Sequence, residues 1–235
     1  MLDGLLDPMR WQMTFSEMDS FWDGFFVTLQ VVVAGLALSL ILGTLLGVFS
    51  TTRSRVLRAI SRVYVEFYQN TPLPVQVFFM YMAGPQLLQA ITGADNPVRI
   101  SSFALGFLGV GLYHAAYVSE VIRTGIEAVP RGQMEAALSQ GFSRVQAYRY
   151  IILPQTFKTI IPALFSQCTT VIKDSSYLAG INVAEFMYST KVVMAQTSEL
   201  SQVLALYGFT FAMYFILNFG ISLLVRAYQR RVVAA

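Results

Sequence analysis

The sequence predicts an all-α integral membrane protein, and two properties of the whole chain carry that prediction. Of the 235 residues, 55% are hydrophobic and only 12% are charged, and the mean hydropathy is +0.57. Soluble domains average about 25% charged residues, so this chain is too poor in charge to cover a soluble surface. Several uncharged stretches are also long enough to cross a bilayer as helices. We therefore expect about five transmembrane helices that form one domain.

The first two predicted spans differ in regularity. The first covers residues 25–49, which hold no charge. As an α-helix this stretch would rise about 37 Å, enough to cross a hydrocarbon core of ~30 Å. The second is predicted from about Val63 to Leu87. Pro72 and Pro74 interrupt it early, because proline lacks the backbone donor of a regular helix.

The remaining spans include one that is unusually short. The third is predicted over residues 101–121 and the fifth over residues 203–225. Between them, only residues 159–172 are free of charge, and this stretch would rise only about 21 Å. Either the fourth helix continues through Lys173 and Asp174, or it breaks there and exposes backbone ends. Short, proline-bearing spans point to binding sites in transporters.

The positions of the basic residues predict the orientation of the spans. Twelve of the sixteen fall on one side: Arg53, Arg55, Arg58, Arg62, Arg123, Arg131, Arg144, Arg149, Lys158, Arg226, Arg230 and Arg231. By the positive-inside rule that side is the cytoplasm, so the amino terminus lies outside and the carboxy terminus inside. The domains are then an external segment 1–24, a transmembrane domain 25–228 and a cytoplasmic tail 229–235. The mostly polar stretch 182–202 becomes an external connection with room for a short amphipathic helix.

The sequence offers little for catalysis. Cys168 is the only cysteine and His114 the only histidine, which excludes a disulfide framework and most metal or catalytic arrangements. No glycine-rich loop is followed by Lys-Ser or Lys-Thr, so the chain has no phosphate-binding loop. The isoelectric point near 9.0 does not imply a nucleic-acid partner, because the positive-inside rule already accounts for the basic residues. We expect no enzyme activity, no metal and no cofactor in this chain, and no nucleic-acid partner.

Residues 135–154 of the predicted cytoplasmic loop favour a helix, a turn and a second helix. Strong helix formers open the segment: Glu135, Ala136, Ala137 and Leu138. Gly141 then allows either a positive φ or a close approach that a side chain would block. Ser143 is a plausible N-cap for a helical stretch over residues 143–150. Such a unit, with its small residues, could dock into a groove on a partner, or it could be an ordinary helical hairpin.

The same segment carries a spaced pattern. It reads Glu-Ala-Ala, three residues, Gly, nine residues, Ile, one residue, Leu-Pro. This pattern resembles the cytoplasmic EAA loop of bacterial ABC-importer permeases. The matching residues are Glu135, Ala136, Ala137, Gly141, Ile151, Leu153 and Pro154. The resemblance implies that these residues form the loop that couples the permease to an ATPase on another chain.

Other segments extend the resemblance over nearly the whole chain. Residues 66–76, EFYQNTPLPVQ, are similar to a segment of polar-amino-acid permeases, the histidine/glutamine/glutamate/arginine group of type I importers. Residues 116–123, 130–133 and 173–176 also resemble that family. The chain departs from the family at Gln69-Asn70, where Arg-Gly is frequent, and at Pro74, where Leu is frequent.

Membership in that family would imply the function and its partners. The chain would be the permease subunit that moves a polar amino acid across the bacterial inner (plasma) membrane by alternating access, as a multi-pass protein in the lipid bilayer. Its partners would be a second permease chain, identical or different, two ABC ATPase subunits that hold ATP and Mg, and an extracytoplasmic solute-binding protein. The alternative is a secondary transporter or channel subunit that is not coupled to ATP, which would leave the EAA loop unexplained.

Five polar residues in or near the spans are candidates for the substrate pathway: Gln76, Glu120, Gln167, Thr170 and Lys173. Polar groups inside a bilayer are costly, so they face a cavity or a partner. Three of the five lie three residues apart along one ridge of the fourth span, where they could offer an amide, a hydroxyl and an ammonium to a zwitterion. The alternative for Lys173 is that it marks the outer membrane interface.

Structural roles compete with these assignments. Glu120 could form a local ion pair with Arg123, and Glu66 could pair with Arg62, four residues earlier. The side chain of Gln76 could bond to backbone freed by the prolines. His114 is expected to be a neutral histidine that is hydrogen-bonded between helices.

Overall fold

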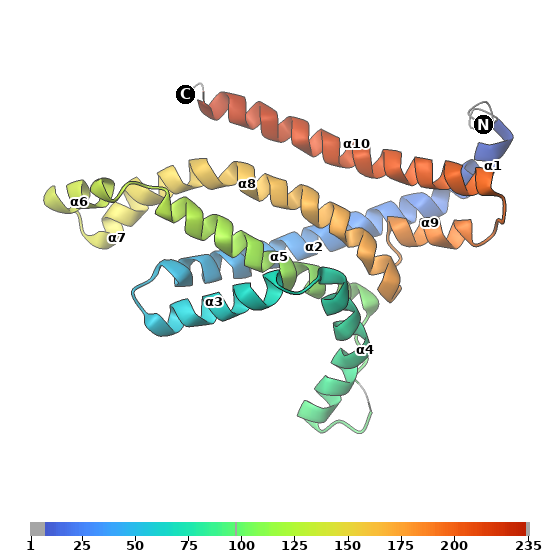
Figure 1. Ribbon diagram of the computed structural model, residues 1–235, viewed down its shortest axis with the longest axis horizontal. Helices are drawn as coiled ribbons and strands as arrows, with labels where there is room; N and C mark the ends of the chain where they lie inside the picture. The colour runs from blue at the N-terminus through green and yellow to red at the C-terminus, as the bar shows by residue number, and fades with distance from the viewer. Residues whose placement is uncertain (1–7, 97, 234–235) are drawn as a thin grey trace. The chain divides into compact units, whose positions relative to one another are not determined.

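The computed structural model describes residues 8–96 and 98–233, which form helices joined by short connections, with no strand in those ranges (Figure 1). The all-α class that composition predicted is therefore confirmed. The elements in chain order are α1 (Pro8–Ser16), α2 (Met18–Thr51), α3 (Arg55–Gln69), α4 (Leu73–Thr92), α5 (Ser102–Glu127), α6 (Arg131–Ser139), α7 (Arg144–Ala147), the π-helix η1 (Tyr148–Ile152), α8 (Leu153–Asp174), the 3₁₀-helix η2 (Ser175–Ile181), α9 (Phe186–Met194) and α10 (Leu200–Val233).

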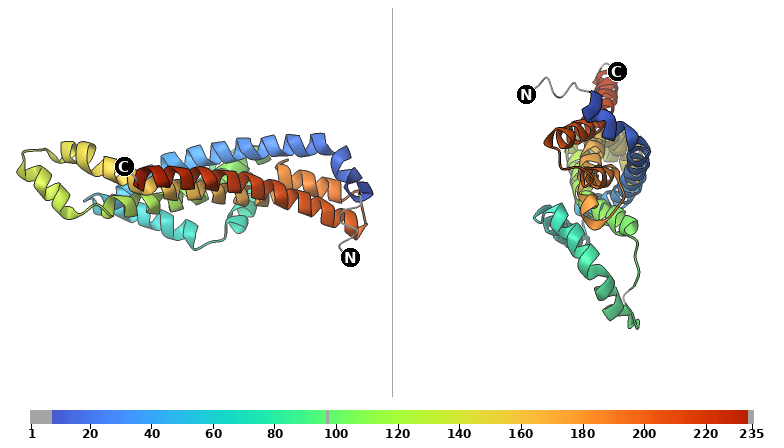
Figure 2. Two further views of the ribbon diagram at one scale, coloured as in Figure 1. Left: turned by 90° about the horizontal axis from the view of Figure 1, so that it is seen from above. Right: turned by 90° about the vertical axis from the view of Figure 1, so that its right-hand side faces the viewer.

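The helices fall into two compact units. The first consists of Met1–Gly35, Leu73–Val110 and Thr169–Ile221, and the second of Leu36–Pro72, Gly111–Cys168 and Ser222–Ala235. Helices α2, α5, α8 and α10 each contribute residues to both units. Both α2 and α10 run as long continuous helices in Figure 1 and in the left view of Figure 2.

Three of the described helices are long and apolar enough to cross a membrane. They are α2, α5 and residues Leu200–Arg230 of α10. They contain the first, third and fifth predicted spans. The second and fourth predicted spans correspond to α4 and α8, each of which carries a proline inside the helix, Pro85 and Pro162 respectively.

The predicted start of the second span near Val63 is wrong. Val63 belongs to the separate helix α3, which ends at Gln69, and α4 begins only at Leu73. Pro72 and Pro74 cannot donate the backbone hydrogen bonds that would continue α3. The hydroxyl of Thr71 instead donates to the Phe67 carbonyl over 2.7 Å, which closes the end of α3.

The fourth helix is longer than the uncharged stretch 159–172 on which its prediction was based. Helix α8 begins at Leu153 and runs through Lys173 to Asp174, a length of 22 residues. Such a helix rises about 33 Å, comparable with a hydrocarbon core of ~30 Å. Of the two alternatives for Lys173 and Asp174, continuation of the helix is the one observed. The 3₁₀-helix η2 follows directly.

The predicted helix in the connection 182–202 is present as α9, with one face buried and Lys191 and Val192 exposed. Four of its residues are buried: Phe186, Ser189, Thr190 and Val193. Phe186 packs against Phe21 and Phe25 of α2, with ring centroids 5.7 and 6.3 Å apart. Tilted and edge-to-face ring pairs of this kind add about 0.5–1.5 kcal/mol beyond burial. In the first unit, α9 is therefore part of the core.

Two glycines of α2 set its distance from α5 in the second unit. A Cβ on Gly43 would lie 2.6 Å from Val118 Cβ and 2.7 Å from the Ala115 carbonyl oxygen. A Cβ on Gly47, one turn later, would lie 2.6 Å from Ile122 Cβ. Small residues four apart allow two membrane helices to approach closely.

Candidate functional site

The candidate coupling loop forms a helical hairpin in the second unit, as its sequence predicted. Glu135, Ala136 and Ala137 lie in α6, and Gly141 lies in the turn with φ at +89°. Nothing lies within 4 Å of the position where a Cβ on Gly141 would be. Of the two roles predicted for this glycine, the backbone conformation is therefore the one that the structure requires.

Backbone hydrogen bonds fix the turn. The Phe142 amide donates to the Ala137 carbonyl over 3.1 Å, and the Gly141 amide donates to the Leu138 carbonyl over 3.0 Å. Together they form a Schellman motif, which satisfies the last carbonyls of α6. The Ser143 hydroxyl then accepts from the Gln146 amide, and the Gln146 side chain accepts from the Ser143 amide over 2.8 Å. The predicted N-cap is confirmed, as part of a complete capping box.

The helix predicted over residues 143–150 continues further than expected and changes its pitch. It begins as α7, becomes the π-helix η1, and passes without a break into α8. Ile151 lies in η1, while Leu153 and Pro154 open α8. The Leu153 amide bonds to Tyr148, five residues back. Pro154 has no backbone amide to donate, so the π-helical turn η1 lies where a regular α-helix would lose a hydrogen bond.

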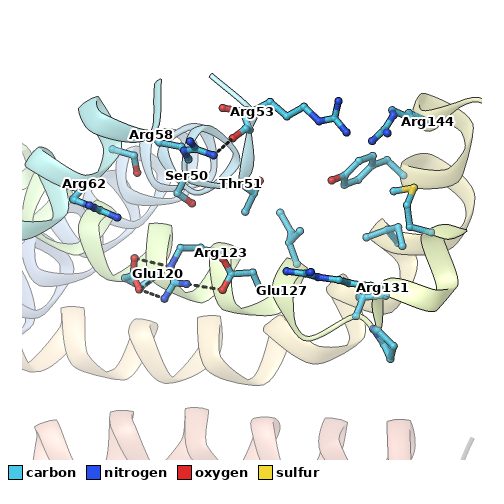
Figure 3. Close-up of a pocket in the computed structure, with 18 of the residues that line it drawn as sticks. Ser50, Thr51, Arg53, Arg58, Arg62, Glu120, Arg123, Glu127, Arg131 and Arg144 are labelled. Atoms are coloured by element: carbon cyan, nitrogen blue, oxygen red, sulfur yellow. Dashed lines mark hydrogen bonds and ion pairs between the residues drawn. The ribbon is translucent and has the colours of Figure 1, made fainter. Parts of the chain in front are cut away.

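A groove of about 1120 Å³ separates this hairpin from the connection between α2 and α3 (Figure 3). All of its lining residues belong to the second unit. Two bonds hold α3 in place beside it: the Ser61 hydroxyl donates to the Leu46 carbonyl over 2.9 Å, and the Tyr64 hydroxyl to the Leu112 carbonyl over 2.7 Å. The charged lining residues are Arg53, Arg58, Arg62, Glu66, Glu120, Arg123, Glu127, Arg131, Glu135 and Arg144.

One wall of the groove contains the local ion pair that the spacing of Glu120 and Arg123 predicted. The guanidinium of Arg123 lies 2.7 Å from Glu120 and 2.6 Å from Glu127 (Figure 3). Pairs at this helical spacing contribute about 0.2–0.5 kcal/mol when they are partly exposed. The charge of Arg123 is thus balanced within α5.

The predicted pair of Glu66 with Arg62 does not form. A carboxylate oxygen of Glu66 instead accepts a hydrogen bond of 2.9 Å from the Asn70 side chain. Asn70 also donates to the Glu66 carbonyl over 2.7 Å, so it caps the end of α3 through both contacts. A capping residue four positions later satisfies the acid locally, which leaves Arg62 free to line the groove.

The candidate pathway residues do not all belong to one compact unit. Glu120 and Gln167 lie in the second, whereas Gln76, Thr170 and Lys173 lie in the first. Gln76 is only 9% exposed, and Lys173 is exposed in the last turn of α8.

Gln167 and His114 form the contact expected of a buried histidine between helices. Nδ1 of His114 lies 3.2 Å from the side-chain oxygen of Gln167 and joins α5 to α8. His114 is 1% exposed. The hydroxyls of Tyr113 and Tyr117 lie 3.0 Å apart on the same helix.

Sequence reasoning missed a buried acid in the first unit. Glu185 caps α9: its carboxylate accepts the Met187 and Tyr188 amides over 3.0 and 2.8 Å, and it is 0% exposed. Burial raises the pKa of this carboxyl to about 7, although the backbone amides and the Tyr214 hydroxyl oppose the shift. The sequence carried no clear signal for this cap, because the preferred N-cap residues are Ser, Thr, Asp and Asn rather than Glu.

Comparisons with known proteins agree on one family. The family described as "Binding-protein-dependent transport system inner membrane component" matches residues 39–234. The chain is 33% identical to the probable glutamine ABC transporter permease protein GlnM of Bacillus subtilis, over 95% of this chain and 98% of that protein. It is 34% identical to the glutamate/aspartate import permease protein GltJ of Escherichia coli K12, over 70% and 68% of the two chains.

Solved structures match as well. The crystal structure of an amino acid ABC transporter with histidines superposes with a TM-score of 0.82 at 27% identity and covers 93% of this chain and 96% of that one. The MetNI methionine ABC transporter, at 15% identity and a TM-score of 0.68, shares the fold over 91% of this chain and 98% of that one. The resemblance drawn from the EAA pattern is confirmed. The chain belongs to the family of binding-protein-dependent transport system inner membrane components.

Proposed function

We propose that this chain is the permease subunit of an ATP-driven importer of a polar amino acid. The observation that carries the proposal is the α6–α7 hairpin. Its spaced pattern coincides with a fixed local geometry: Gly141 at positive φ, a Schellman motif before it and a capping box after it. The substrate class is supported by relatives that are described as glutamine and glutamate/aspartate permeases.

The membrane topology is part of the proposal. Five spans would cross the bacterial inner membrane, corresponding to α2, α4, α5, α8 and α10, with the amino terminus outside and the carboxy terminus in the cytoplasm. The arginines around the groove and the α6–α7 hairpin belong to one unit, which suits a common cytoplasmic position. The partners would be a second permease chain, two ATPase subunits and an external solute-binding protein.

The hairpin would act as a mechanical link. An ATPase that docks on α6 and α7 would move the start of α8, because η1 joins α7 to α8 without a break. Closure of the two ATPases on ATP would thus open the spans outward, and hydrolysis would reset the inward state. ATP and Mg are held by the partner, and this chain is a transport component rather than an enzyme.

The substrate pathway is proposed to include Gln76, Glu120, Gln167, Thr170 and Lys173. Replacement of Thr170 by a bulky apolar residue should impair transport and leave basal ATP hydrolysis by the complex unchanged. Single cysteines at 167 and 170, in a chain with Cys168→Ser, should react with water-soluble thiol reagents and be protected by substrate. If both positions are inert in every nucleotide state, the ridge does not face the pathway.

The proposal as a whole is tested by purification of the chain with its membrane partners and identification of the subunits by mass spectrometry. An ATPase with a phosphate-binding loop should copurify. Transport by this chain alone in proteoliposomes, without ATPase, would favour the alternative of a secondary transporter or channel.

A further inference from the structure

The groove beside the coupling hairpin has a second wall that the EAA pattern does not include. It consists of Ser50, Thr51, Thr52, Arg53, Arg58 and Arg62, from the end of α2 to the middle of α3, and we name it the α2–α3 wall. Figure 3 shows Arg53, Arg58 and Arg62 on one side of the groove, with Arg131 and Arg144 on the other. Two segments that are far apart in the sequence thus share one cytoplasmic recess.

The positive charge of this recess is not balanced internally. Six arginines and four glutamates line it, a formal net charge of +2, and one of these arginines, Arg123, pairs with two of the glutamates, Glu120 and Glu127. Within residues 8–96 and 98–233, the three arginines of the α2–α3 wall have no ion pair. Arg58 donates only to a neutral group, the Thr52 carbonyl, over 3.2 Å, which holds its guanidinium against the loop. Arginine forks in a shared recess attract carboxylates or phosphates, which they bind through two parallel hydrogen bonds.

The arginines of α3 lie on a different face of the helix from its exposed apolar residues. Val56, Ile60 and Val63 form an exposed apolar stripe along the helix, at 67%, 51% and 69% exposure. At 100° per residue, Arg58 and Arg62 lie roughly on the opposite face from that stripe. The positive-inside rule explains why arginines follow α2, but a lipid headgroup would be met on the apolar side of α3. The recess is therefore better suited to a protein partner than to a membrane surface.

We propose that the α2–α3 wall is a second docking contact for the ATPase subunit, which meets it with acidic side chains. This inference rests on the proposed function, because it takes as given that the ATPase sits on the α6–α7 hairpin. A partner on the hairpin would also border this groove, because residues of α6 and α7 line it. The partner's carboxylates would neutralise Arg53, Arg58 and Arg62. It would then hold the end of α2 and the start of α8 together, so that both helices move with one subunit.

The test uses the assembled permease–ATPase complex in nanodiscs of purely zwitterionic lipid. The permease carries Arg58→Glu and Arg62→Glu, and the affinity of the ATPase is measured as a function of salt. We expect at least a tenfold loss of affinity at low salt and a weaker salt dependence. The control is Arg55→Glu, to be compared with Arg58→Glu alone as an equal single charge reversal; Arg55 is exposed and does not line the groove, so this variant should bind like the unmodified chain. The double variant Arg58→Lys and Arg62→Lys should lose less affinity than the glutamate variant, because lysine keeps the positive charge and lacks only the planar fork of donors.

A second readout does not depend on charge. A photo-crosslinker attached to a cysteine at position 58, in a chain with Cys168→Ser, should capture the ATPase, and one at position 55 should not. Equal binding by the Arg58/Arg62 and Arg55 variants, together with no crosslink from position 58, would overturn the inference. So would a loss of affinity that appears only in nanodiscs with anionic lipid, since the wall would then bind headgroups.

The outcomes also separate this inference from the proposed function. If Gly141→Leu in the hairpin abolishes ATPase binding while the Arg58/Arg62 variant binds normally, only the second contact is wrong. If neither variant affects binding, the ATPase does not dock on the hairpin and the proposed function fails with it. Thermal unfolding of each purified variant verifies that the exposed substitutions leave the chain folded.

Discussion

The hydroxyl of Tyr214 on α10 donates a hydrogen bond of 2.9 Å to the carboxylate of Glu185, which caps α9. Through this contact a fully buried acid joins the connection after α8 to the last long helix of the first unit. Phe186, the next residue, donates its amide to the Thr28 hydroxyl on α2 over 3.0 Å. Three segments distant in the sequence thus meet at the start of α9, at the Glu185 carboxylate and the neighbouring Phe186 amide.

This carboxyl group predicts a pH dependence of stability. Its pKa is about 7 in the fold against 4.5 ordinarily, so the folded state holds the proton more tightly between those values. The free energy of unfolding should therefore fall as the pH rises from about 4.5 to about 7, by on the order of 3 kcal/mol at most, and level off above. Lys191, the charged neighbour that opposes the shift, limits the effect.

The measurement is the melting temperature of the purified chain at pH 5 and pH 8. The unmodified chain should melt higher at pH 5, and Glu185→Gln should reduce the difference. Glu199→Gln, which removes an exposed carboxylate from the same connection, should leave it unchanged. An unaltered pH dependence in the Glu185 variant would show that this group does not titrate as stated.

Gly141 and Gly132 provide a matched pair in the coupling hairpin. Both positions have open space around them, but only Gly141 has a positive φ. Gly141→Ala should cost about 1–2 kcal/mol in the turn, and Gly132→Ala, inside α6, should be neutral or stabilising by about 0.5–1 kcal/mol. Solute-stimulated ATP hydrolysis by the complex should fall in the first variant only. Equal activities would mean that the turn geometry is not needed for coupling.

The close approach of α2 and α5 predicts intolerance at Gly43. An alanine there would press its Cβ against the Ala115 carbonyl oxygen, 2.7 Å away, and a backbone atom cannot rotate aside. We expect a loss of about 1–3 kcal/mol, which corresponds to several degrees in melting temperature. Gly220→Ala on α10, with nothing within 4 Å, is the control and should not lower it. A Gly43→Ala chain as stable as the control would refute tight packing at this crossing.

The proposed topology predicts opposite reporter readings at two places. A reporter fused after residue 231 should be active only as a cytoplasmic protein, and one inserted near Asn96 only as an external one. Twelve of sixteen basic residues on one side are the physical basis. Reversed readings at both places would exclude the orientation and, with it, a cytoplasmic coupling hairpin.

Local signals in the sequence were the reliable ones. The cap at Ser143 and the turn at Gly141 depend on residues within a few positions of each other, so their chemistry alone determines them. The break near Pro72 was also visible, but α3 was merged into the second span because apolar residues continue on both sides of the prolines. The uncharged stretch 159–172 is shorter than α8, because Lys158 interrupts the apolar residues without ending the helix, which begins at Leu153.

Contacts between distant segments could not be predicted. The Glu185 carboxylate is reached by Tyr214, and Thr28 of α2 binds the next residue's amide, but nothing near Glu185 in the sequence indicates either contact. The groove likewise depends on how α3 is tied to α2 and α5, through Ser61 and Tyr64. The predicted partner of Glu66 was Arg62, but Asn70 also lies four residues away. Asn70 follows the last residue of α3, where its side chain caps the helix and also binds the Glu66 carboxylate.

The central claim, that this chain transports only when a partner hydrolyses ATP, is tested by reconstitution in proteoliposomes. Uptake of a radiolabelled polar amino acid is measured with the permease alone, with the ATPase added, and with the solute-binding protein and ATP added. The account predicts uptake, and stimulation of hydrolysis by loaded binding protein, only in the full assembly. Uptake by the permease alone, or ATP hydrolysis by the pure chain, would contradict it.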